Sequence, residues 1–229
     1  MLKIENYIHQ PSMWPMIKKY IFDYAATYKL PSDSDDQTVI SLITNLARDT
    51  FADSNERITF KKAIIKLSQG KTNTLIRKNQ HRLCYVLGFS SQQQADHFLC
   101  DYLHTNELSA RSLQEFIIVC GLNCGLSWEK TKAIQQDFRE AIDAQPLAPK
   151  TINLEDQTYN LVLDVINQTI KTEQDLRNYL SSEQNLAFFA KTRNQHYKSL
   201  FSDIIYYKEN GRVLLVNDEN RDSNLLARK

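Results

Sequence analysis

The sequence predicts an all-α protein: a multi-helix bundle of tandem helix hairpins, with a smaller C-terminal helical domain. Apolar residues recur every three or four positions through most of the chain, which is the period of an amphipathic helix. The 229 residues include only five glycines and five prolines, whereas β-sandwiches and barrels need many special turns. Apolar residues make up 42% of the chain and charged residues 24%, so we expect a folded core rather than extensive disorder.

Composition also limits the classes of function. No apolar run approaches the roughly 20 residues that span a bilayer, and the N-terminus carries no apolar segment of signal-peptide length. The four cysteines form no small-domain disulfide framework, so we expect a cytoplasmic protein with reduced thiols. The sequence has no Gly-rich phosphate loop, nucleophile elbow or zinc-protease helix. We therefore expect neither enzymatic activity nor a cofactor, with Glu115, His104 and His196 as isolated catalytic candidates.

The first helices are predicted from their caps and apolar stripes. Residues 12–29 form a helix that Ser12 can cap, and Pro31 ends it. Asp35 or Asp36 caps a second helix, and residues 53–55 are predicted as a loop.

Glycines mark the helix ends in the next part of the chain. A helix ends at Gly70 and the following one stops at Gly88, because glycine suits a left-handed cap. Ser90 or Ser91 begins another helix, and Ser91 has capping-box spacing to Gln94. A very apolar helix follows over residues 110–123, and an amphipathic helix then runs over 128–144.

Two of the five prolines lie in residues 145–149, which indicates a domain boundary. The predicted N-terminal domain therefore covers 1–145, the C-terminal helical domain 150–217, and a flexible tail 218–229. The predicted elements of the C-terminal domain are helices over 154–170, from 172, over 182–191 and over 194–207, and a short strand over 213–216.

The stretch Arg57–Ala95 concentrates positive charge. It contains eight lysines and arginines and no acidic residue: Arg57, Lys61, Lys62, Lys66, Lys71, Arg77, Lys78 and Arg82. Such charges repel one another unless they are spread out or matched by a polyanion. Nucleic-acid phosphates could supply that match. The alternatives are an acidic partner protein, or neutralisation inside the fold by nearby acids such as Asp33, Asp35, Asp36, Asp49 and Asp53.

A glycine-marked corner separates two predicted helices inside this stretch. Cys84 lies four residues before Gly88, and Phe89 and Ser90 follow it. This order, over about Gln80–Cys100, resembles the helix-turn-helix of Cro/CI-type repressors, which implies that the second helix enters the major groove of DNA. The residues nearest the bases would then be Ser91, Gln92 and Gln93.

Two features depart from that family pattern. Gln94 stands where the family carries an apolar core residue, and the helix after Gly88 has no lysine or arginine in its first turns. A similar order of cysteine, glycine, apolar residue and serine recurs around Gly125. A plain helix hairpin, closed by glycine and capped by serine, is therefore the alternative interpretation of both corners.

The predicted function is a non-enzymatic regulatory protein that binds DNA or RNA through its basic stretch. The expected phosphate ligands are Lys61, Lys62, Lys66, Arg77, Lys78 and Arg82. The alternative is a helical adaptor or inhibitor that binds a protein, or a second copy of itself, through the same basic face or the C-terminal aromatic residues. No membrane association is expected.

Two His-x-x-Cys pairs raise the question of zinc. His81 with Cys84, and His97 with Cys100, each lie three residues apart, so each pair shares one helical face. Four nitrogen and sulfur ligands suit tetrahedral zinc, but cysteine is commonly a small core residue. We predict no metal site, and these four residues are the ones to inspect.

Overall fold

The computed structural model describes residues 12–31, 33–109, 112–143 and 169–190, which consist of helices and connecting loops without a strand. This confirms the all-α prediction. None of the helices in these ranges is long and apolar enough to cross a membrane. The elements are α1 (Met13–Asp23), α2 (Ala25–Tyr28), α3 (Asp36–Thr50), α4 (Ser54–Ser68), α5 (Arg77–Val86), α6 (Gln92–Asp96), the π-helix η1 (His97–Tyr102), α7 (Leu113–Asn123), α8 (Trp128–Asp143) and α10 (Glu173–Ser181).

Most predicted helix starts are confirmed by side-chain caps. Ser12, Asp35 and Ser91 each accept a hydrogen bond from a backbone N–H in the first turn of the helix that follows. The loop predicted at residues 53–55 lies two residues earlier, at 51–53. The Asp53 carboxylate accepts hydrogen bonds from the N–H groups of Asn55 and Glu56, and this cap starts α4 at Ser54.

The glycine-terminated helices are also confirmed. Gly70, Gly88 and Gly125 have φ values of 67°, 77° and 64°, in the left-handed region that favours glycine. The N–H of Phe89 donates to the backbone carbonyl of Cys84, and the N–H of Gly88 donates to the backbone carbonyl of Tyr85. This is the Schellman arrangement, which satisfies carbonyls that the end of a helix would leave unpaired.

Two local features were not predicted. The first helix breaks at Tyr24 into α1 and α2, and Lys29 closes α2 in the left-handed conformation. The helix after Gly88 changes to the wider π-helical turn at His97. That turn leaves Phe98 and Leu99 in the core and His97 at the surface.

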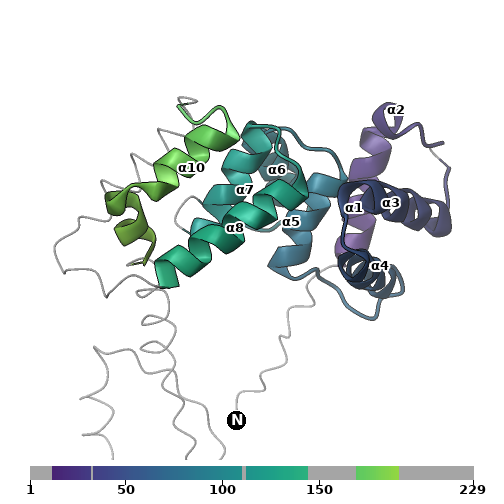
Figure 1. The fold of residues 1–229 in the computed structure, drawn as a ribbon. Coiled ribbons are helices and arrows are strands. Elements are labelled where there is room, and N and C mark those ends of the chain that lie inside the picture. Colours follow the sequence, from purple (N-terminus) through teal and green to yellow (C-terminus); the bar gives the residue numbers. More distant parts are fainter. Residues whose placement is uncertain (1–11, 32, 110–111, 144–168, 191–229) are drawn as a thin grey trace, which may run out of the picture.

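Figure 1 shows α1–α4 at one end of the molecule, α10 at the other, and α5–α8 between them. α3 packs on α4 and α5, and α7 packs on α8. The Trp128 ring, from the start of α8, contacts the rings of Phe51 and Tyr85 edge to face. This side chain therefore joins the N-terminal helices to the central ones.

α10 shares this core. Leu176 and Leu180 of α10 are fully buried, and the ring of Phe116 on α7 packs against those of Tyr179 and Phe189. The described part of the predicted C-terminal domain, residues 169–190, thus packs on the N-terminal helices. The predicted boundary at 145–149, the helices predicted over 154–170 and 194–207, the strand at 213–216 and the tail lie wholly or largely outside the described residues.

Helix α7 approaches α5 and α8 closely at Gly121. A Cβ atom at this position would lie 2.6 Å from both Thr131 Oγ1 and Tyr85 Oη, which are hydrogen-bonded to each other at 2.9 Å. We expect Gly121→Ala to lower the free energy of unfolding by about 1–3 kcal/mol, the usual cost of an overpacked core. Urea unfolding measures this. The added methyl should cost less in a Thr131→Ala background, and an equally or more stable Gly121→Ala protein would contradict the close approach.

Candidate nucleic-acid interface

The eight basic residues of Arg57–Arg82 separate into two groups in the structure. Lys61, Lys62, Lys66, Lys71 and Lys78 are exposed and Arg57 is partly exposed, whereas Arg77 and Arg82 are held by other parts of the protein. Only the first group can meet a ligand without disturbing the fold.

Helix α4 presents four of the exposed cations on its solvent side. Its buried side chains recur at helical spacing, and they comprise Glu56, Phe60, Ile64 and Leu67. The opposite side therefore carries Arg57, Lys61, Lys62 and Lys66, which we call the α4 basic face. Within the described ranges, no carboxylate lies within 4 Å of any of these four cations.

Arg82 is buried in an ion pair with Glu56. Only 6% of its surface is exposed, and its Nε atom lies 2.9 Å from Glu56 Oε1. Its Nη1 atom donates to Asn79 Oδ1, also at 2.9 Å. Lys132 of α8 bonds the other oxygen of Glu56 at 2.8 Å. Burial opposes ionisation of Glu56, but hydrogen bonds from Lys132 and Arg82 outweigh it and lower the pKa of this carboxyl.

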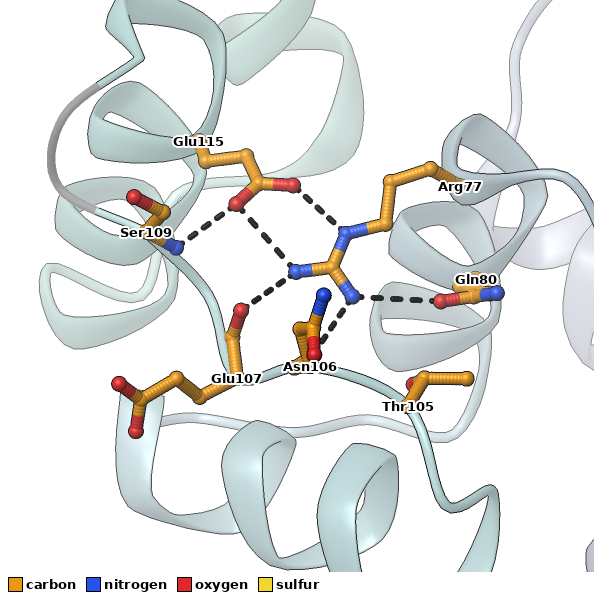
Figure 2. Close-up of a pocket in the computed structure, with 7 residues that line it drawn as sticks. All are labelled: Arg77, Gln80, Thr105, Asn106, Glu107, Ser109 and Glu115. Atoms are coloured by element: carbon orange, nitrogen blue, oxygen red, sulfur yellow. Dashed lines mark hydrogen bonds and ion pairs between the residues drawn. The ribbon is translucent and has the colours of Figure 1, made fainter. Parts of the chain in front are cut away.

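Arg77 clamps a loop against α7, as Figure 2 shows. Its guanidinium bonds both carboxylate oxygens of Glu115, at 2.6 and 3.3 Å. Its other N–H groups donate to the backbone carbonyls of Asn106 and Glu107 and to Gln80 Oε1. All five of the donors that arginine possesses are therefore used. The clamp lines a polar pocket of about 390 Å³, formed by Arg77, Gln80, Thr105, Asn106, Glu107, Ser109 and Glu115.

Glu115 is the centre of the hydrogen-bond network that includes Arg77. The Nε2–H of buried His81 donates to it at 3.0 Å, and the Ser109 N–H donates at 2.7 Å. Burial opposes ionisation of Glu115, but the hydrogen bonds from His81, Arg77 and Ser109 outweigh it and lower its pKa to about 2. The carboxylate therefore serves as a charged structural anchor, and every donor around it is already engaged.

Of the predicted phosphate ligands, the structure keeps Lys61, Lys62, Lys66 and Lys78 accessible. Arg77 and Arg82 are neutralised inside the fold, which was the alternative interpretation. The neutralising acids are Glu56 and Glu115, and none of the five nearby aspartates that were considered pairs with them. Two of those aspartates cap helices, and Asp36 pairs with Lys18.

The predicted base-contacting residues lie at the start of α6. The Ser91 hydroxyl caps this helix by accepting from the N–H of Gln94, and the Gln92 N–H donates to Asn123 Oδ1. The Gln93 side chain is exposed. Residues Gln92–Asp96 themselves include no lysine or arginine, and these three residues are not on α4 with its lysines.

The two His-x-x-Cys pairs have separate surroundings. His81 bonds Glu115, and Cys84 is fully buried. His97 lies at the surface between Tyr24 and Asp101. Among the described residues there is no group of three or more His, Cys, Asp or Glu side chains placed to hold a metal ion.

Comparisons of the chain with protein-family models, with curated proteins and with solved structures give no match. Any proposal about function therefore depends on the geometry of the residues described above.

The residues that sequence reasoning missed are the acidic partners. Glu56 directly precedes the acid-free stretch, so counting charge from Arg57 onward excluded the carboxylate that neutralises Arg82. Glu115 was noticed as a carboxylate in an apolar helix, but only as a catalytic candidate. A charged residue at a core position was the available signal, because such a residue is almost never buried without a partner.

Proposed function

We propose that this protein is a non-enzymatic regulator that binds nucleic acid through the α4 basic face, with Lys71 and Lys78 as further phosphate contacts. The single observation behind the proposal is that the fold neutralises two of the basic residues and leaves the others exposed. Arg77 and Arg82 have partners within the fold, whereas no carboxylate of the described residues lies within 4 Å of the four cations of α4. Holding four like charges on one helix face costs stability, and a polyanion offsets that cost.

We choose nucleic acid as the partner because three of the four cations on this surface are exposed lysines. Lysine is a flexible point charge that suits phosphate groups in varied positions, as sequence-independent backbone binding requires. The fold engages Arg77 and Arg82 internally, and Arg57 joins the lysines on the α4 basic face. The adaptor function remains the alternative outcome of the test below.

A salt series of binding to a random-sequence duplex tests the proposal. Fluorescence anisotropy should show binding that weakens steeply with salt, because each neutralised phosphate adds about −0.9 to the slope of log K against log salt. The variant Lys61→Glu/Lys62→Glu/Lys66→Glu should bind at least about 100-fold more weakly, with a slope shallower by about 3.

The matched control changes net charge by the same amount elsewhere. Lys29, Arg139 and Lys171 are exposed and lie outside α4, and Lys29→Glu/Arg139→Glu/Lys171→Glu should keep most of the affinity and nearly the original slope. Equal losses in both triple variants would show that net charge, not this face, drives binding. Absence of binding to duplex or single strand at about 50 mM salt, where phosphate contacts are strong, would overturn the proposal.

A further inference from the structure

The cations of α4 form two rows along the helix. Arg57 and Lys61 are four residues apart, as are Lys62 and Lys66, so each pair lies along one line of the helix surface. At 3.6 residues per turn the two lines are separated by about 140° around the axis. The face is therefore a pair of charged edges, not a single central stripe.

Between the two rows the helix carries no acid, and two isoleucines lie near the centre of this strip. Ile58 is 51% exposed, unusually so for a large apolar residue, and Ile65 beside it is partly buried. Both lie about 80–100° from Arg57, which places them midway between the rows. A flat phosphate surface would leave Ile58 without a partner, whereas Ile65 already packs against the core.

The floor of a DNA major groove fits this pattern. We infer that α4 enters the major groove of B-form duplex DNA, with Arg57 and Lys61 facing the phosphates of one strand and Lys62 and Lys66 those of the other. This inference rests on the proposed function and specifies its ligand. Ile58 would then meet the base edges, where an apolar side chain can contact the methyl group of thymine.

The dimensions and the position of α4 agree with this arrangement. A helix with its side chains is about 10–12 Å across, and the major groove is about 12 Å wide. α4 lies at the edge of the molecule in Figure 1, and its buried side chains pack toward α1, α3 and α5. A-form RNA has a deep, narrow major groove that side chains cannot read, so the ligand is DNA.

The helix after Gly88 is a weaker candidate for the same role. α6 spans only Gln92–Asp96 before the π-helical turn begins. Residues Gln92–Asp96 include no lysine or arginine that could hold a phosphate on either side of the helix. The resemblance to a repressor helix-turn-helix therefore concerns the corner, while the charged edges that a groove requires are on α4.

Blocking the groove without changing the phosphates tests this inference. Substituents on pyrimidine C5, the position of the thymine methyl, project into the major groove. A duplex whose cytosines carry glucosylated hydroxymethyl groups at C5 should therefore bind at least about 10-fold more weakly than the same unmodified duplex, since the sugars occupy the space that α4 would enter. An A-form RNA duplex should likewise bind more weakly than the DNA duplex.

Equal affinity for modified and unmodified DNA, or for RNA and DNA duplexes, would overturn groove entry and leave backbone binding intact. Binding to single strands alone would likewise overturn groove entry, and no binding to any of these duplexes or to single strands would overturn the proposed function itself. Two isoleucine variants supply the matched control. Ile58→Ala should weaken binding to an A·T-rich duplex and leave the salt slope unchanged. Ile76→Ala, at an exposed isoleucine outside α4, should change neither.

Discussion

Replacing Arg82 with methionine should lower the free energy of unfolding by about 3 kcal/mol, because removing one member of a buried ion pair leaves the other charge without compensation. Glu56 would keep only Lys132, which is partly exposed. Urea unfolding at neutral pH, followed by circular dichroism, measures the loss. Under the proposed function, the same variant should bind DNA as the wild type does, since Arg82 is buried.

The control for this experiment lies on the same helix. Lys78→Met removes an exposed cation of α5 and should change stability by less than about 0.5 kcal/mol. The double variant Glu56→Leu/Arg82→Met should recover much of the loss, because apolar residues can replace a buried ion pair. A loss below about 1 kcal/mol for Arg82→Met would place this pair with weak surface ion pairs and contradict its structural role.

Replacing Glu115 with glutamine should cost about 3 kcal/mol at pH 7 and remove part of the pH dependence of stability. The pKa of Glu115 is about 2 in the folded protein, against an ordinary value of 4.5. Because the folded pKa is the lower one, the contribution is fully present above about pH 5, and it is lost as the pH falls toward 2. The size follows from about 1.4 kcal/mol per pKa unit.

Unfolding curves at several pH values between 7 and 2 test this expectation. The stability difference between wild type and Glu115→Gln should shrink as the pH falls. Glu107→Gln provides the control, because Glu107 lines the same pocket and its exposed carboxylate does not contact Arg77, which bonds only its backbone carbonyl. A constant difference between wild type and Glu115→Gln across this pH range would show that Glu115 is not an ionised anchor.

The glycine corner illustrates how far local signals carry. Gly88 was predicted to end a helix, and its left-handed conformation and Schellman bonds confirm that prediction. The nature of the following helix was not predictable, since the π-helical turn at His97 has no local marker. What the sequence could indicate was a turn, and what it could not indicate was which of the neighbouring helices would carry an exposed charged face.

By itself, the sequence of this protein determined the all-α class, most helix starts and the three glycine-terminated ends, because caps and periodic apolar residues act within a few positions of one another. Tertiary structure alone decided which basic residues are exposed. Arg82 and Arg77 meet their carboxylates across 26 and 38 residues of chain, and the two acids are brought to them by the packing of α4 and α7 on α5. A contact between distant segments produces no periodic pattern in the sequence. The exposed positive charge of α4 could therefore be recognised only in the folded protein.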